Sequence, residues 1–281
     1  MIWNNVKEAK MHSPDYLGWK EEDAMTDFFQ RINNYKKVYE KIEEAEGNSF
    51  IRLENTGEKL ITFRARGYAI GRITQLLSNT QLALRPIILT RPGESLSTSQ
   101  GRLGMDTSMT PQGGLYAKKF CETVHELALT RGFRPVVWAS DMLSARQMVQ
   151  PLVDRGYEVV HLPALNDLNA GAMSGLTYEQ FAAKYPEEYE LRAANKLKYR
   201  FPKGESYNDV FRRVEPIILE LIGETSPVII VSHTPVLRII YGYLQSTPPD
   251  DCPMLDIPLH AAIILRPCGY GYEEERAYPL E

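Results

Sequence analysis

From residue 86 onward, short apolar runs alternate with longer amphipathic segments, and this alternation constrains the fold more than any other feature. The runs IILT, PVVWAS, EVVHLPAL, SPVIIVSH and AAIILRP are continuously apolar at their centres, as is typical of strands buried on both faces of a parallel sheet. Segments with helical periodicity separate them, among them 111–132, 205–223 and 235–245. The pattern predicts an α/β fold: a three-layer domain whose helices cover both faces of a largely parallel sheet.

The first 82 residues follow a different pattern. Two short alternating runs on either side of Asn-Thr-Gly predict a β-hairpin, and 68–79 is predicted to be helical. So few strands do not provide a full core of their own. We therefore expect 1–82 to be the C-terminal portion of a larger domain with a linker, and 83–281 to be a second domain. An amphipathic helix is predicted within 13–47 from apolar residues spaced by three and four: Ala24, Met25, Phe28, Phe29, Ile32, Tyr35 and Tyr39.

Composition argues against several functional classes. A net charge of −4 without long Lys/Arg runs argues against a nucleic-acid partner. Cys121, Cys252 and Cys268 lie far apart and form no CxxC pair, so neither a disulfide framework nor a zinc site is expected. There is no signal-peptide pattern and no window of ~20 apolar residues, which predicts a cytoplasmic protein without a membrane partner.

Two strand ends carry polar residues. Arg91-Pro92-Gly93-Glu94-Ser95 follows one apolar run, and Ser232-His233-Thr234-Pro235 follows another. Because ligands of parallel sheets bind beyond the carboxyl ends of the strands, we expect Arg91 and His233 to face each other there. Pro-Gly is also a favoured pair at the centre of a type II turn, which by itself would explain Pro92.

Several uncommon sequence words occur in order along the chain: LTRPGES, LNDLNAG, GLTYEQF, YPEEYELR, FPKGESYNDVFRRVEP and VSHTPVLRIIYGYL. Together they resemble the bisphosphatase half of the bifunctional 6-phosphofructo-2-kinase/fructose-2,6-bisphosphatase family, within the histidine phosphatase superfamily. VKEAKMHSPDY and DFFQRINNY are similar to the last part of that family's kinase domain. The resemblance covers almost the whole chain, and it implies a histidine phosphatase-like domain preceded by an α+β remnant of a kinase domain.

The resemblance implies phosphoryl transfer to the histidine of an Arg-His-Gly motif, with a second histidine and two arginines clamping the phosphate and a carboxyl group protonating the leaving sugar oxygen. Arg91 and His233 match their family positions. Four positions depart from the pattern, which predicts an inactive site: Pro92 stands at the nucleophile, Thr98 at a phosphate-binding Asn, Ser144 at the second clamping Arg, and Asp167 at the longer acid. Arg146 lies two residues beyond Ser144 and is expected to face elsewhere on its helix.

The part of the pocket that holds the sugar 6-phosphate in this family matches better. Arg192 and Lys196 are four residues apart, so on a helix they would share one face, although a solvated basic face is the alternative interpretation. A purely structural role is the alternative for His233. The resemblance implies these further ligand contacts: Gly104, Tyr178, Tyr207, Arg238 and, where the family has Gln, Thr234.

In the N-terminal portion, the resemblance assigns fructose 6-phosphate contacts to Lys10, Arg31 and Tyr35, with ordinary helix packing as the alternative for the last two. The phosphate-binding GxxxxGK[ST] loop is absent, so no ATP site is expected to assemble from this chain. We therefore expect a segment of a longer protein, with the rest of a kinase domain in cis and a homodimer in the full-length form.

Three functional classes remain open on the sequence. The first is a silent phosphatase-like domain that binds fructose 2,6-bisphosphate, fructose 6-phosphate or inorganic phosphate. The second is a working bisphosphatase in which His233 or water replaces the nucleophile. The third is an interaction scaffold that binds no ligand. No cofactor or metal is expected in any of them.

Overall fold

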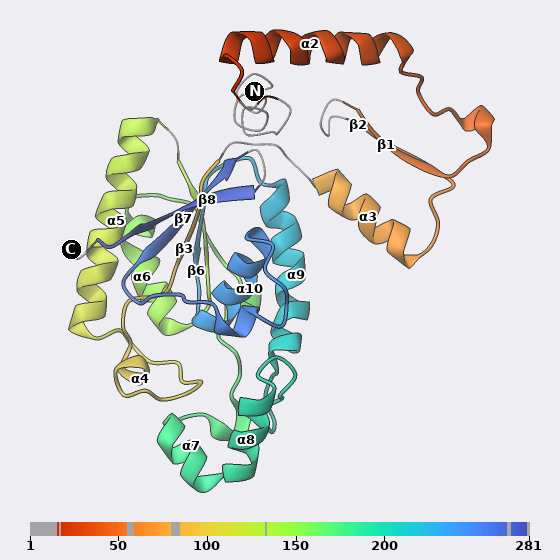
Figure 1. Ribbon diagram of the computed structural model, residues 1–281. Coiled ribbons are helices and arrows are strands. Elements are labelled where there is room, and N and C mark those ends of the chain that lie inside the picture. The colour runs from red at the N-terminus through yellow and green to blue at the C-terminus, as the bar shows by residue number, and fades with distance from the viewer. Residues whose placement is uncertain are drawn as a thin grey trace. The chain divides into compact units, whose positions relative to one another are not determined.

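The computed structural model describes residues 16, 18–54, 59–79, 85–132, 134–268 and 271–279. The chain divides into two compact units, one of Met1–Leu84 with Pro267–Glu273 and one of Arg85–Arg266 with Glu274–Glu281. Both are shown in Figure 1. Lys10 and the Asn-Thr-Gly turn lie outside the described residues.

The N-terminal unit holds a long helix, a hairpin and a second helix. The hairpin pairs β1 (Phe50–Glu54) with β2 (Lys59–Phe63) in antiparallel register. Helix α3 (Tyr68–Asn79) has the predicted bounds, and a short 3-10 turn (Glu44–Glu46) precedes the hairpin. The hairpin and both helices predicted from the sequence are thereby confirmed.

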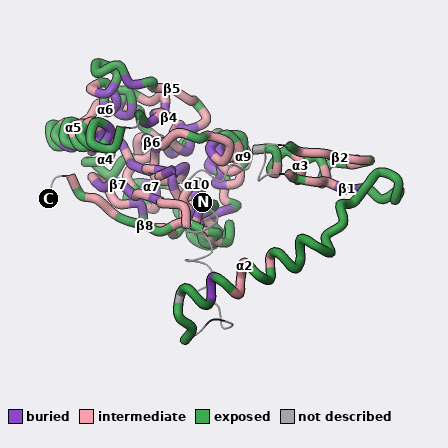
Figure 2. Tube along the Cα trace, turned by 90° about the horizontal axis from the view of Figure 1, so that it is seen from above, coloured by how far each residue is buried: buried purple, intermediate pink, exposed green. Residues whose placement is uncertain are grey.

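Helix α2 (Glu21–Val38) buries only part of its apolar stripe. Ala24 and Met25 are buried, whereas Tyr35 is 70% exposed and Tyr39 lies just beyond the end of the helix. Figure 2 shows α2 exposed along most of its length. The three- and four-residue spacing therefore predicted the helix correctly, although the described residues cover little of its apolar face.

The second unit is built on one six-stranded sheet with the order β5-β4-β6-β3-β7-β8. Its strands are β3 (Ile87–Thr90), β4 (Val136–Ala139), β5 (Val159–His161), β6 (Val228–Val231), β7 (Ala262–Cys268) and β8 (Gly271–Ala277). The first four strands of that order run parallel, and β7 runs antiparallel to β3. The predicted α/β fold is confirmed, with a sheet that is parallel on one side and mixed on the other.

Helices cover both faces of this sheet, as Figure 1 shows. One face carries α5 (Pro111–Arg131) and α6 (Leu143–Asp154), and the other carries α9 (Tyr207–Gly223) and α10 (Thr234–Leu244). The shorter helices α4 (Leu96–Ser99), α7 (Tyr178–Lys184) and α8 (Pro186–Ala194) lie beyond the carboxyl ends of the strands. Short 3-10 turns complete the unit at Pro163–Leu165, Gly171–Met173 and Cys252–Met254.

The central strands are fully buried because their side chains meet a helix layer on each face. All four residues of β6 have no exposed surface, and Leu89 of β3 and Val137 of β4 are equally buried. Side-chain caps fix where α5 and α9 begin: Thr110 accepts from the Gly113 N–H, and Ser206 accepts from the Asp209 N–H. The buried sheet and its helices thus hold the loops at the carboxyl edge. None of the described helices combines the length and apolar character needed to cross a membrane.

Candidate functional site

The loop after β3 packs tightly against the start of α5. Pro92 and Gly93 are buried. A Cβ added at Gly93 would lie 2.2 Å from the Gly113 carbonyl oxygen, so only glycine fits. Gly93 does not have a positive φ, which the third residue of a type II turn requires, so the predicted type II turn is wrong. Close contact between two backbone segments, rather than turn geometry, accounts for the Gly93 position.

The backbone amides of this loop are used within the fold. The Glu94 N–H donates to the His260 Nε2 at 3.1 Å, and the Leu96 N–H donates to the Ser108 carbonyl at 3.0 Å. The Ser97 N–H donates to the Thr107 Oγ1 at 3.0 Å. Pro92 has no N–H at all. The amides of Glu94, Leu96 and Ser97 are therefore not free to join a row of amides of the kind that commonly cradles a phosphate.

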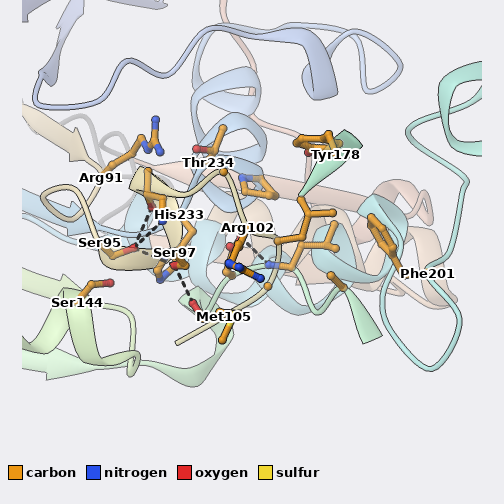
Figure 3. A pocket seen from close by; sticks show the side chains of 18 of the residues that line it. Arg91, Ser95, Ser97, Arg102, Met105, Ser144, Tyr178, Phe201, His233 and Thr234 are labelled. Atoms are coloured by element: carbon orange, nitrogen blue, oxygen red, sulfur yellow. Dashed lines mark hydrogen bonds between the residues drawn. The ribbon is translucent and has the colours of Figure 1, made fainter. Parts of the chain in front are cut away.

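A cavity of about 330 Å³ opens beside this loop, at the carboxyl edge of the sheet. Figure 3 shows several of its side chains. The volume lies in the range of roughly 300–1,000 Å³ that is usual for small-molecule sites. Most of the residues singled out from the sequence line it: Arg91, Pro92, Thr98, Gly104, Ser144, Asp167, Tyr178, Arg192, Lys196, Tyr207, His233 and Thr234.

Two other residues from the sequence lie away from the cavity. Arg238 does not line it but stands behind Tyr207, donating to the Tyr207 hydroxyl at 3.2 Å and to the Leu255 carbonyl at 2.6 Å. Arg146 pairs with the carboxylate of Asp141 on the exposed surface and points elsewhere, as its helical position predicted.

His233 occupies the position before α10 and is held by Ser140. Its Nε2 lies 2.9 Å from the Ser140 Oγ, which in turn lies 3.1 Å from the Asn166 Oδ1. Burial lowers the pKa of His233, although the negative charge of Asp167 opposes this effect. The imidazole is therefore neutral at physiological pH, with one ring nitrogen engaged by the fold.

Arg91 and Asp167 are opposite charges at the same side of the cavity. The Arg91 guanidinium donates to the Ile257 carbonyl at 3.4 Å. Burial lowers the pKa of Arg91, and the nearby Asp167 carboxylate raises it. Arg213 holds the Asp167 segment in place, since it donates to the Asp167 and Asn166 carbonyls at 3.1 and 2.9 Å.

The other side of the cavity is the cationic end, formed by Tyr178, Arg192, Lys196 and Tyr207. Arg192 donates to the Tyr178 hydroxyl at 3.2 Å and lies 5.1 Å from the centre of that ring. Lys196 donates to the Pro253 carbonyl at 2.9 Å. Burial, together with the positive charges of Arg238 and Arg192, lowers the pKa of Lys196 to about 8.

The expectation that Arg192 and Lys196 share a helix face is wrong. Helix α8 ends at Ala194, and Asn195 follows in a non-helical conformation with φ −149° and ψ 86°. Both side chains nevertheless line the same cavity, Arg192 from the last turn of α8 and Lys196 from the segment that follows it.

The hydroxyl end of the cavity is formed by Ser95, Ser97, Thr98 and Ser144, of which Thr98 is exposed and the other three are buried. Ser95 and Ser97 were not anticipated from the sequence. The Ser95 Oγ lies 3.0 Å from the Ser97 Oγ and 2.9 Å from the Thr98 Oγ1. The repeated hydroxyls of SLSTS were the available sequence signal. Arg102, at the rim, was also missed; it donates to the Gly175 carbonyl at 2.7 Å.

In the N-terminal unit, Arg31 and Tyr35 lie on α2. The Arg31 Nε lies 2.8 Å from the Asp27 Oδ2, and its guanidinium stands over the Tyr16 ring. Tyr35 is exposed beside Ile32. Among the described residues, no group of three or more His, Cys, Asp or Glu side chains is arranged to hold a metal ion.

Family models match both parts of the chain. Residues 87–277 match the histidine phosphatase superfamily, branch 1, and residues 1–83 match 6-phosphofructo-2-kinase.

Curated relatives match along almost the whole chain. A 6-phosphofructo-2-kinase/fructose-2,6-bisphosphatase of Caenorhabditis elegans is 40% identical over 95% of this chain and 58% of its own length. A protein of the same name from Arabidopsis thaliana is 38% identical over 98% of this chain and 37% of its own length. A fructose-2,6-bisphosphatase of Saccharomyces cerevisiae is 36% identical over 96% of this chain and 59% of its own length. The chain thus spans between about a third and three fifths of the length of these relatives.

Solved structures match the second unit in fold. An α-ribazole phosphatase from Shigella flexneri is similar with a TM-score of 0.60 and 20% identity, covering 69% of this chain and 96% of its own. A mycobacterial glucosyl-3-phosphoglycerate phosphatase complexed with VO3 is similar with a TM-score of 0.57 and 20% identity, covering 68% of this chain and 97% of its own. At this level of identity the likeness concerns the fold alone.

Proposed function

Because the chain belongs to the histidine phosphatase superfamily, within the bifunctional enzyme family of fructose 2,6-bisphosphate metabolism, we propose that its second unit binds a sugar phosphate without hydrolysing it. The ligand is fructose 2,6-bisphosphate or fructose 6-phosphate. The observation that carries the proposal is the buried Pro92 directly after Arg91, in a cavity that is also lined by Arg192 and Lys196.

Hydrolysis through a phosphohistidine needs a nucleophile, a clamp for the equatorial oxygens and a proton for the leaving oxygen. Pro92 supplies no nucleophile, and Ser144 supplies no positive charge for a clamp. Removing a nucleophile from a serine protease lowers kcat by on the order of 10⁶, which indicates the scale of the loss. The chemistry of this cavity is therefore disabled at two of its three requirements.

Binding a sugar phosphate requires fewer groups than hydrolysing it, and the residues of the cationic end support binding. Arg192 and Lys196 can form charge-assisted hydrogen bonds to a phosphate dianion, and the hydroxyls of Tyr178 and Tyr207 add neutral donors. The tyrosine hydroxyls are positioned by cations, since Arg192 contacts Tyr178 and Arg238 contacts Tyr207. These contacts favour a binding domain over a ligand-free scaffold.

One observation favours the second candidate, an active bisphosphatase. His233 is a neutral imidazole inside the cavity, and a neutral imidazole is the form in which histidine attacks phosphorus. Its Nε2 is held by Ser140, however, so attack from that nitrogen would break an existing hydrogen bond. We propose that His233 has a structural and ligand-positioning role.

Calorimetry combined with a phosphate-release assay separates the three candidates. We expect fructose 6-phosphate or fructose 2,6-bisphosphate to bind, with no phosphate released above the protein-free rate. Lys196→Ala should weaken binding about tenfold or more, whereas Lys198→Ala, an exposed lysine two residues away, should leave it unchanged. If neither ligand binds, the interaction scaffold is the candidate that remains. If phosphate is released and His233→Ala abolishes the release, the active bisphosphatase is the candidate that remains.

For the whole protein we propose that the rest of a kinase domain lies in cis and that the full-length form is a homodimer. The match of residues 1–83 to 6-phosphofructo-2-kinase supports the first part of this proposal.

A further inference from the structure

The two ends of the cavity differ in charge. Arg192 and Lys196 line the cationic end, and the only acid that lines the cavity among the described residues is Asp167, on the other side. There the negative charge of Asp167 offsets the positive charge of Arg91. The carboxylate of Asp106 also raises the pKa of His233, against the larger effect of burial. With a neutral His233, Arg91 and Asp167 leave the hydroxyl end without a net charge, whereas Arg192 and Lys196 give the cationic end two positive charges. Arg102, the remaining cation that lines the cavity among the described residues, lies at the rim, where its guanidinium donates to the Gln100 side chain and the Gly175 carbonyl.

The hydroxyl end is a hydrogen-bonded network rather than a set of free donors. The Thr107 hydroxyl donates to the Ser97 Oγ at 3.0 Å, and Ser95 accepts from the Thr98 N–H at 3.2 Å. A hydroxyl both donates and accepts, whereas a phosphate dianion only accepts. The network can therefore exchange hydrogen bonds with a sugar hydroxyl more readily than it can surround a dianion.

Ser144 is the member of this end whose hydroxyl has no hydrogen-bond partner among the residues that the structure describes. Its side chain is buried, with 6% of its surface exposed, and it lines the cavity, yet among the described residues no hydrogen bond engages its hydroxyl. Figure 3 shows Ser144 on the same side of the cavity as Ser95, Ser97 and Arg91, away from Tyr178 and Phe201. Because Ser144 lines the cavity and the structure does not bury its hydroxyl as an unsatisfied atom, that hydroxyl is available both to donate to a ligand hydroxyl and to accept from it.

We propose that the cavity is selective for a ketohexose monophosphate over the corresponding bisphosphate, with the phosphate at the cationic end and the anomeric hydroxyl of the sugar hydrogen-bonded to Ser144. The proposal rests on the proposed function and specifies its ligand. The domain would then sense the monophosphate, the hexose form without a phosphoryl group at its anomeric carbon.

The physical basis of this selectivity is desolvation. A second phosphate placed at the hydroxyl end would lose its water and gain one arginine, already opposed by Asp167, in return. A sugar hydroxyl loses far less hydration and finds both a donor and an acceptor in the serine hydroxyls. We therefore expect fructose 6-phosphate to bind at least about tenfold more tightly than fructose 2,6-bisphosphate.

The test is calorimetric titration of the 281-residue chain with both ligands. An ionic strength of about 0.15 M screens non-specific attraction between the ligands and exposed positive charges. Ser144→Arg introduces positive charge at the hydroxyl end and should raise the affinity for the bisphosphate until it equals or exceeds that for the monophosphate. Gln150→Arg adds the same charge at an exposed position of the same helix and should leave the preference unchanged.

A second comparison needs no large side chain. Ser144→Ala should weaken fructose 6-phosphate binding about three- to tenfold, the usual effect of one hydrogen bond. The same substitution should not affect 2,5-anhydromannitol 6-phosphate, an analogue that lacks the anomeric hydroxyl. An equal loss for both ligands would refute the contact between Ser144 and that hydroxyl.

The outcomes separate this proposal from the one on which it rests. Equal or tighter binding of the bisphosphate to the unaltered chain overturns the selectivity and leaves the silent sugar-phosphate pocket standing. Failure of both ligands to bind overturns the proposed function and this inference together. Tighter binding of the monophosphate, reversed by Ser144→Arg and not by Gln150→Arg, supports both.

Discussion

Raising the pH from 7 to 9 should weaken sugar-phosphate binding about tenfold, because it removes the proton from Lys196. The pKa of Lys196 in the empty cavity is lowered to about 8 by burial and by the charges of Arg238 and Arg192. A lowered lysine pKa means that the ammonium form predominates below about pH 8 and is lost above it. A bound phosphate dianion stabilises the ammonium and raises this pKa, so binding is coupled to protonation.

The size of the effect follows from the pKa. With a pKa of about 8, the protonated fraction of Lys196 falls from about 0.9 at pH 7 to about 0.1 at pH 9, so the apparent affinity falls by nearly the same ratio. Burial raises the pKa of Tyr199 and of Tyr207, so both hydroxyls stay neutral, and a phosphate monoester is already a dianion above its second pKa of about 6.

The assay is calorimetric titration with fructose 6-phosphate at pH 7, 8 and 9, in two buffers with different ionisation enthalpies. At pH 8, binding should take up about half a proton, the fraction missing from Lys196 in the free chain. Lys196→Met should abolish both the pH dependence and the proton uptake, and Lys198→Met should keep both. A dissociation constant that stays the same from pH 7 to 9 would refute the reasoning. So would a Lys196→Met variant whose dissociation constant depends on pH as steeply as that of the unaltered chain.

Two further predictions concern the loop after β3. If the shape of the loop is intact, the double variant Pro92→His, Ser144→Arg should form phosphohistidine at position 92 and release phosphate from fructose 2,6-bisphosphate. Its gain in rate should exceed the product of the gains of the two single variants. A double variant that binds the ligand but forms no phosphohistidine would contradict this. Gly93→Ala should destabilise the chain by about 1–3 kcal/mol or more in urea unfolding, because its Cβ would lie 2.2 Å from the Gly113 carbonyl oxygen. Gly114→Ala, in open space, should be neutral or stabilising, and equal midpoints for the two variants would disprove the packing argument.

The fold was predictable where burial leaves a simple trace in the sequence. Strand β6 appears as the continuous run VIIV because both of its faces are covered, and β3 and β4 are equally apolar. Strand β8 (Gly271–Ala277) was missed because it is an edge strand with consecutive charged residues and little burial. Strand β5 was predicted too long, since it ends at His161 before the 3-10 turn at Pro163–Leu165.

The site was predictable where it depends on strand order and unpredictable where it depends on distant contacts. Arg91 and His233 follow β3 and β6, which are neighbours in the sheet, so their convergence follows from topology. The buried Gly93–Gly113 contact depends on how closely the start of α5 approaches the loop, which no local pattern encodes. That the Ser144 hydroxyl faces the cavity without a partner from the described part of the chain is likewise visible only once the whole cavity is assembled.

The most direct test of a binding pocket without hydrolytic chemistry is ³¹P nuclear magnetic resonance of the chain mixed with fructose 6-phosphate and fructose 2,6-bisphosphate. One set of spectra reports ligand binding through broadening or shift of the phosphate signals, and hydrolysis through the appearance of inorganic phosphate. We expect the fructose 6-phosphate signal to broaden or shift when the chain is added, and to stay as it is without protein when Lys196→Ala is added instead. No inorganic phosphate should accumulate above the protein-free control. Inorganic phosphate that grows with chain concentration and disappears in His233→Ala would contradict the account.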